Sequence, residues 1–155
     1  MGIKSFVAAR KNQNKEVQEV SVRVSDYMSR DLITFKPEQT VEDVIDKLIT
    51  NKISGGPVVN DNYELIGIIS EGDCLKQVSD SRYYNMPMEQ HKVETRMIRD
   101  VETIDGNMNI FDAANKFLES KRRRFPIVMD GKLVGQISQK DILKAALTLK
   151  GHNWK

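Results

Sequence analysis

Two stretches of the chain show the same order of hydrophobic and polar positions. Each begins with a short run of apolar and β-branched residues, at 32–35 and at 101–104, which predicts an extended segment. A helix follows in each stretch, because apolar residues recur at the spacing of one helix face. These residues are Val41, Val44, Ile45, Leu48 and Ile49 in the first stretch, and Ile110, Ala113, Ala114, Phe117 and Leu118 in the second. Thr40 with Asp43, and Asn109 with Asp112, are typical of the N-terminal caps of such helices.

A β-hairpin and a second helix complete each stretch. Residues 57–59 and 65–69 flank a turn in the first, and residues 126–128 and 133–137 flank a turn in the second. Ser70 and Ser138 then begin helices that carry Leu75 and Leu143. The predicted unit is therefore β-α-β-β-α, present in two copies.

The two copies also match residue by residue, at a shift of about 69 positions. Met28 corresponds to Met97 and Pro57 to Pro126, and after a one-residue deletion Asp73 corresponds to Asp141. A unit of about 55 residues buries little surface alone, so the copies are expected to pack together. We therefore predict an α+β fold in which two β-α-β-β-α repeats form one module with pseudo-twofold symmetry.

This repeat divides the chain into five parts. We expect an N-terminal arm at 1–23, the first repeat at 24–78, a polar connector at 79–92, the second repeat at 93–149 and a C-terminal tail at 150–155. Two copies create related clefts where they meet, and small-molecule sites favour such interfaces.

Composition narrows the function classes. Of the 155 residues, 39% are hydrophobic and 30% are charged, and the formal net charge of +2 gives no general argument for nucleic acid or an acidic membrane. No apolar stretch approaches the roughly 20 residues that cross a bilayer. The single cysteine, Cys74, cannot form an internal disulfide, which favours a reducing compartment and hence the cytoplasm. His91 and His152 are isolated, so we expect no metal site.

No enzyme motif is present in the sequence. It contains neither a Gly-rich phosphate loop that ends in Lys-Ser/Thr, nor a Gly-x-Ser-x-Gly elbow, nor a His-Glu-x-x-His helix. One aspartate per copy suits two equivalent ligand sites better than a catalytic pair with separated pKa values. We therefore expect a protein that is not an enzyme and has no catalytic cofactor.

The end of each copy carries a family resemblance. The sequences Gly67-Ile-Ile-Ser70 with Asp73, and Gly135-Gln-Ile-Ser138 with Asp141, together with the order of elements, resemble the CBS domain in a tandem pair. The resemblance covers about 125 residues, from Val24 to Leu149. It implies a disc-shaped module that binds AMP, ADP, ATP or another adenosyl ligand, commonly forms a homodimer, and regulates a separate protein. The residues do not identify that protein or choose among these ligands.

Two interpretations of the Ser-x-x-Asp motif stay open. Where a strand enters a helix, unpaired backbone N–H groups can bind phosphate, and the resemblance implies that the aspartate binds the ribose. The same residues also fit a capping box that only stabilises the helix.

In members of the family, each cleft combines the Ser-x-x-Asp of one copy with the first strand and the pre-proline segment of the other. By this resemblance cleft one contains Ile33, Ser54, Gly55, Gly56, Pro57, Ser138, Lys140 and Asp141. Cleft two contains Ser70, Asp73, Glu102, Arg123, Arg124, Phe125 and Pro126. The two glycines of cleft one are expected to let a base or backbone approach closely.

The charged residues of the two clefts differ. The resemblance implies that Arg124 contacts the phosphate of the ligand, to which a guanidinium group can make two hydrogen bonds. Lys121 and Arg122 are instead expected to lie at a solvated helix end. Arg123 fits either role. Glu102 replaces an apolar residue of the family pattern; if its side chain faces the cleft, it would either disfavour phosphate or accept from an adenine amino group.

Three functions are therefore compared. The first is a regulatory adenosyl-binding module that dimerises through helix faces containing Val44, Leu48 and Leu75. The second is an interaction module that binds no nucleotide, in which both motifs are only helix caps. The third, nucleic-acid binding through residues 122–124 and the basic arm, is the least supported because the net charge is small.

Overall fold

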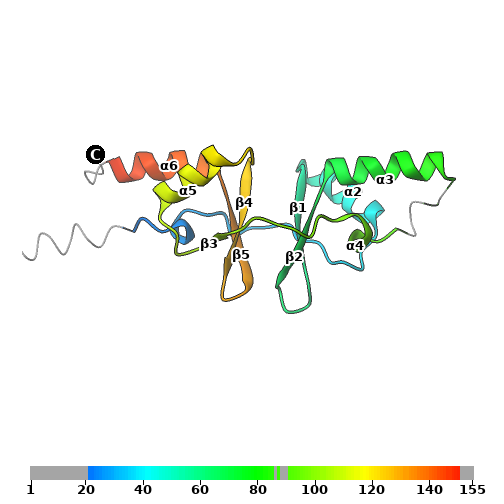
Figure 1. Cartoon of the computed structure of the whole chain (residues 1–155), viewed down its shortest axis with the longest axis horizontal. Coiled ribbons are helices and arrows are strands. Elements are labelled where there is room, and N and C mark those ends of the chain that lie inside the picture. The colour runs from blue at the N-terminus through cyan, green and yellow to red at the C-terminus, as the bar shows by residue number, and fades with distance from the viewer. Residues whose placement is uncertain (1–20, 86, 88–90, 151–155) are drawn as a thin grey trace, which may run out of the picture.

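The computed structural model describes residues 21–85, 87 and 91–150 (Figure 1). The first half of the fold contains α2 (Val41–Asn51), β1 (Gly55–Val59), β2 (Leu65–Ser70), α3 (Glu71–Tyr83) and α4 (Val93–Arg96). The second half contains the short 3-10 helix η1 (Val24–Asp26), β3 (Ile104–Asp105), α5 (Ile110–Glu119), β4 (Arg124–Met129), β5 (Lys132–Ser138) and α6 (Gln139–Lys150). The mixed helix and strand content is the α+β fold that the repeat predicts.

The strands of the two halves lie next to each other at the centre of the molecule, and the helix pairs α2–α3 and α5–α6 extend outward (Figure 1). Strands β1 and β2 form an antiparallel hairpin in which Gly55 is opposite Ser70. Strands β4 and β5 form the matching hairpin, with Arg124 opposite Ser138, and β3 runs parallel to β4. In both hairpins, the residue two positions before the proline thus lies opposite the serine that begins the following helix.

The two predicted amphipathic helices form as the sequence indicates. In α2, Asp43 N–H donates to the Thr40 side chain at 3.1 Å, and Val41, Val44 and Leu48 are buried. In α5, the Asn109 side chain accepts from the N–H of Phe111 rather than that of Asp112. Because Val44 and Leu48 are in the core, the prediction that they supply dimer surface is wrong; Leu75, at 70% exposure, does face solvent.

Each half is completed by the segment that begins the other repeat. The core of the second half contains Val24 and Met28, from the start of the first repeat, together with Ile104 and Phe125. The core of the first half contains Val93 and Met97, from the start of the second repeat. Backbone bonds reinforce this exchange, since Ile110 N–H donates to Val22 O and Val41 N–H to His91 O. The copies are consequently interlocked in one module.

Two predicted elements differ from the structure. The segment 32–35 pairs with β1 only through an isolated bridge between Phe35 and Val58, whereas its counterpart forms the two-residue strand β3. Helix α3 continues to Tyr83, five residues beyond the last apolar position, Val78, that marked its predicted end. Its last turns are polar, so hydrophobic periodicity could not reveal them.

A polar network explains the extension of α3. The Gln77 side chain is fully buried, donates to Ser81 Oγ at 3.0 Å, and accepts from Arg96 of α4. Arg96 also forms an ion pair with Asp80 at 2.8 Å. The segment that leads into the second repeat therefore holds the end of α3 in helical form.

Candidate functional site

Both Ser-x-x-Asp turns form capping boxes at the entrances of α3 and α6. Ser138 N–H donates to Asp141 Oδ2 at 2.9 Å, and Asp141 N–H donates to Ser138 Oγ at 3.2 Å. Ser70 and Asp73 form the same box. In the described part of the chain these bonds engage Oδ2 of each aspartate, so Oδ1 is free to accept from another molecule. Both capping boxes are thus present, and they leave open whether the aspartates also contact a ligand.

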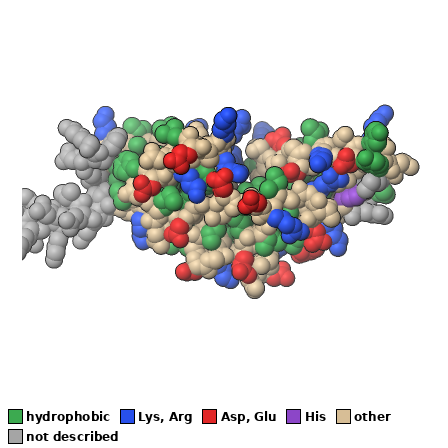
Figure 2. All heavy atoms as spheres, in the orientation of Figure 1, with side chains coloured by type: hydrophobic (Ala, Val, Ile, Leu, Met, Phe, Trp, Pro, Cys, Tyr) green, Lys and Arg blue, Asp and Glu red, His purple; other side chains and the backbone are tan. Residues whose placement is uncertain are grey.

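A central cavity of about 240 Å³ lies where the two hairpins meet. Residues from both copies line it. The first copy contributes Ser54, Gly55, Gly56, Pro57, Ile68 and Ser70, and the second contributes Arg122, Arg123, Arg124, Pro126 and Gln136. Figure 2 shows a notch at the upper edge of the molecule between the halves, with basic side chains beside it. An anionic ligand could contact both copies here.

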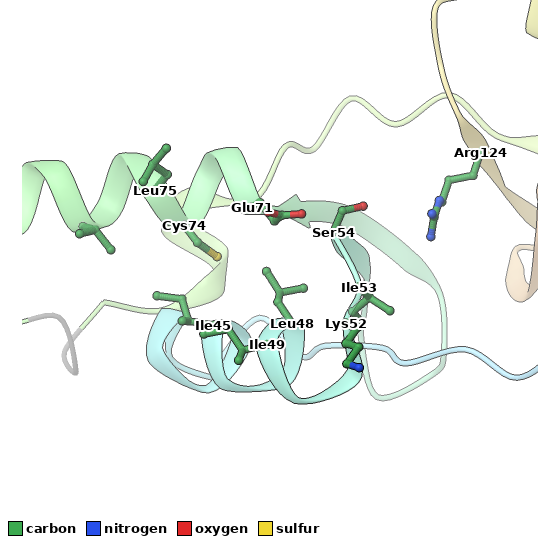
Figure 3. Close-up of a pocket in the computed structure, with 11 residues that line it drawn as sticks. Ile45, Leu48, Ile49, Lys52, Ile53, Ser54, Glu71, Cys74, Leu75 and Arg124 are labelled. Atoms are coloured by element: carbon green, nitrogen blue, oxygen red, sulfur yellow. The ribbon is translucent and has the colours of Figure 1, made fainter.

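A larger hollow of about 570 Å³ adjoins the central cavity between α2 and α3. Figure 3 shows Ile45, Leu48 and Ile49 of α2 opposite Cys74 of α3, with Leu75 on the outer side of α3 and Arg124 of the other half at the far end. The hollow shares Ser54 and Arg124 with the central cavity. An apolar surface is therefore continuous with the arginine cluster.

The glycines of the pre-proline segment are required by close packing within the chain. A Cβ on Gly55 would lie 2.8 Å from Ile69 O. A Cβ on Gly56 would lie 2.8 Å from the Phe35 ring and 2.9 Å from Ile33 O. The space beside Gly56 is thus filled by the extended segment 32–35 of the same copy. The predicted site residue Ile33 therefore lies with its backbone against Gly56.

The division into two clefts differs from the prediction. Ser70 meets Arg123, Arg124 and Pro126, as expected for cleft two, but residues 54–57 of cleft one line the same cavity. Ser138 pairs with Arg124 across the second hairpin, and Lys140 is exposed on the first turn of α6. The short hairpins bring the two pre-proline segments together, so their residues share one space.

Two predicted site residues have different surroundings from those expected. Phe125 is fully buried against Phe117, with ring centroids 4.7 Å apart, because its neighbours Arg124 and Pro126 take the cavity side of β4. Its side chain belongs to the core rather than to a cleft. Glu102 forms an ion pair with Arg122 at 3.1 Å.

Sequence reasoning missed three residues of the cavity wall, Ile68, Arg122 and Gln136. Arg122 was assigned only to a helix end, yet it lines the cavity because α5 stops at Glu119 and residues 120–123 lead back into β4. Gln136 is a polar residue within the apolar run 133–137 of β5, a signal that could have marked it.

Cys74 is an unreactive neighbour of the site. It is 4% exposed, and burial, assisted by the negative charges of Asp73 and Glu71, raises the pKa of its thiol to about 11. The thiol is therefore protonated at neutral pH and a poor nucleophile. Among the described residues there is no group of three or more His, Cys, Asp or Glu side chains that could hold a metal ion.

The repeat, the interlocked halves and the shared cavity define a tandem module with a cavity between its two copies. A family model, the CBS domain, matches residues 24–80 and 92–148. The chain belongs to the CBS domain family and contains two such domains in tandem. Within the described ranges, no helix combines the length and apolarity needed to span a bilayer.

Relatives agree with this assignment. The chain is 31% identical over 153 residues to the chloroplastic CBS domain-containing protein CBSX1 of Arabidopsis thaliana, a match that covers 82% of this chain and 65% of the relative. It is 27% identical to the uncharacterized protein MJ1225 of Methanocaldococcus jannaschii, covering 99% of this chain and 51% of that protein. The chain thus spans between about half and two thirds of these relatives' length.

A solved structure supports the fold. The crystal structure of CBSX2 in complex with AMP superposes with a TM-score of 0.71 at 32% identity, covering 84% of this chain and 99% of that one. CBSX2 is also a protein of Arabidopsis thaliana.

Proposed function

We propose that this protein is a regulatory module that binds an adenine nucleotide, AMP, ADP or ATP, or another adenosyl ligand, in the central cavity. The observation that carries the proposal is the cavity itself, in which Arg123 and Arg124 of one copy face Ser54 and Ser70 of the other. The AMP complex of CBSX2 supports the ligand class.

Each part of the site suits one part of the ligand. Arg123 and Arg124 are exposed and form no ion pair within the described residues, so their guanidinium groups are available to phosphate. Asp73 is bonded to the cavity residue Ser70, and Asp141 is bonded to Ser138, which pairs with Arg124. Neither aspartate lines the cavity itself, but Oδ1 of either can accept from the ribose hydroxyls of a ligand that extends beyond the cavity wall. Pro57, Ile68 and Pro126 provide apolar surface for a base. This is binding chemistry, and we assign the protein no catalytic step.

Regulation follows from the position of the cavity. A ligand that contacts both copies stabilises one arrangement of the halves over others, and a separate protein can respond to that difference. We also propose a homodimer, because the helices expose large apolar side chains: Ile49, Leu75, Leu118, Leu143 and Leu147 are each at least 66% exposed. The free, buried Cys74 is compatible with a reducing cytoplasm.

Isothermal titration with AMP, ADP, ATP and S-adenosylmethionine tests the proposal. We expect saturable binding that weakens about tenfold or more in Arg124→Gln, since a charge-assisted contact is lost. Arg82→Gln removes the same charge from the exposed C-terminal part of α3 and is the matched control. Failure of the folded wild-type protein to bind any of these ligands would contradict the proposal.

The capping boxes favour one alternative, an interaction module that binds no nucleotide. Under it, Asp73→Ala and Asp141→Ala cost only about 0.5–2 kcal/mol of folding stability each. Under our proposal they also weaken ligand binding, so titration and unfolding of the same variants separate the two. Nucleic-acid binding receives less support, because acidic and basic side chains are interspersed on the face in Figure 2 and Arg122 is paired with Glu102.

A further inference from the structure

The ion pair between Arg122 and Glu102 stands at the edge of the proposed ligand site. Arg122 Nε donates to Glu102 Oε1 at 3.1 Å, and the two side chains are 45% and 48% exposed. Arg122 lines the central cavity, whereas Glu102 lines a neighbouring acidic hollow that also contains Asp112, Glu119 and one cation, Lys116. The ion pair therefore lies between the central cavity and the acidic hollow. It holds one of the three cavity arginines, Arg122, on the side of the acidic hollow.

The pairing divides the three arginines into two groups. Arg123 and Arg124 make no ion pair in the described part of the chain and can both turn to an anion. Arg122 can do so only by leaving Glu102, while its backbone stays held where Gln139 Nε2 donates to Arg122 O at 3.4 Å. One phosphate group, with a charge near −2, is satisfied by two guanidinium groups. Each further phosphate must compete with Glu102 for the guanidinium group of Arg122. It also approaches the negative charge of the Glu102 carboxylate.

We propose that Glu102 is a specificity-determining residue of this site, which favours nucleoside monophosphates over triphosphates by holding Arg122. The inference rests on the proposed function and adds to it a preference for phosphate number. The mechanism is competition between a carboxylate and a polyphosphate for the same guanidinium, together with repulsion between the two anions.

Removing the carboxylate while keeping its shape tests this role. In Glu102→Gln, Arg122 is released and the repulsion is lost. Because exposed ion pairs are modest, we expect the affinity for ATP, relative to AMP, to rise by about two- to fivefold. The affinity for inorganic tripolyphosphate, a probe that has no base, should rise by a similar factor. Thermal unfolding of each variant checks that the fold is intact.

Two further variants isolate the pair. Glu119→Gln removes the same charge from the same acidic hollow, and we expect it to leave the ATP-to-AMP ratio unchanged. Arg122→Gln should lower ATP affinity, and in its presence Glu102→Gln should retain only the smaller gain that comes from the lost repulsion. An equal response to Glu119→Gln, or an effect of Glu102→Gln that is undiminished without Arg122, would overturn the proposal.

The titrations also separate this inference from the proposed function. If neither AMP nor ATP binds the wild-type protein, both fail together. If both bind and Glu102→Gln leaves their ratio unchanged, only the role of Glu102 fails. An equal gain in affinity for AMP and ATP, with none for tripolyphosphate, would assign Glu102 to the base and likewise overturn the proposal.

Discussion

Ser29 and Gln136 donate to each other's carbonyl groups through their backbone N–H groups, at 2.9 Å in both directions. Ile68 and Ile98 form the equivalent pair in the other half, at 2.9 and 2.8 Å. Each pair joins the lead segment of one repeat to the last strand of the other. The pseudo-twofold relation is thus present in the backbone bonds that hold the repeats together, beside the cavity that they share.

The backbone pairing between Ser29 and Gln136 depends on the glycine next to Gln136. A Cβ on Gly135 would lie 2.6 Å from Ser29 O and 2.7 Å from Met28 Sδ. We expect Gly135→Ala to lower the free energy of unfolding by about 1–3 kcal/mol, measured by denaturant titration. Gly72→Ala is the matched control. Its Cβ would meet only Ser70 Oγ at 3.7 Å, so within α3 it should stabilise by up to about 1 kcal/mol. Equal effects of the two substitutions would refute the steric argument.

The buried network at the end of α3 should depend on Arg96. Arg96→Met leaves the fully buried Gln77 side chain without its donor, which we expect to cost about 1–3 kcal/mol. Hydrogen exchange should accelerate in the last turns of α3 before it does so elsewhere. Arg99→Met, which removes an exposed arginine three residues away, should change stability by no more than about 0.5 kcal/mol. Unchanged exchange in α3 would show that the network is not what extends the helix.

The raised pKa of Cys74 predicts how stability depends on pH. In the unfolded chain the thiol ionises near its ordinary pKa of 9.0, whereas in the folded protein it stays protonated to about 11. Between these values the unfolded state binds fewer protons, so stability falls as pH rises and is unaffected by this group below pH 9. Unfolding of the wild-type protein and of Cys74→Ala, compared from pH 8 to 11, isolates this contribution. Parallel curves for the two proteins would contradict it.

The proposed homodimer predicts that an exposed leucine is covered by a second copy. Leu147 of α6 is 74% exposed, and we expect Leu147→Gln to shift the protein toward monomer in light scattering at low concentration. Thr148→Gln alters the neighbouring exposed position and should leave the assembly unchanged. A wild-type protein that is monomeric at every concentration would exclude the dimer.

Features that repeat in the sequence were predictable. The spacing of Val41, Val44 and Leu48 identified α2, and the shared serines and aspartates identified where α3 and α6 begin, because local periodicity and capping determine both. The tandem arrangement followed from the match between the copies.

Features that depend on tertiary contacts were not predictable in the same way. The last turns of α3 have no apolar period, since Gln77 and Arg96 hold them through polar contacts. Phe125 and Arg124 are adjacent in the sequence, and only the pairing of β4 decides which of them reaches the cavity. The partner of Arg122 lies 20 positions earlier in the chain, beyond any local pattern.

The interlocked cores give the chain a nested topology. The first core is built from one continuous stretch between Ile33 and Met97, whereas the second needs Val24 and Met28 as well as residues after Ile104. The first half is thus an insertion within the second. During synthesis Val24 leaves the ribosome about 80 residues before Ile104, a delay of roughly 4 to 16 seconds. The part of the second core that is made first must therefore wait, with its apolar side chains exposed, while the complete first half can already fold.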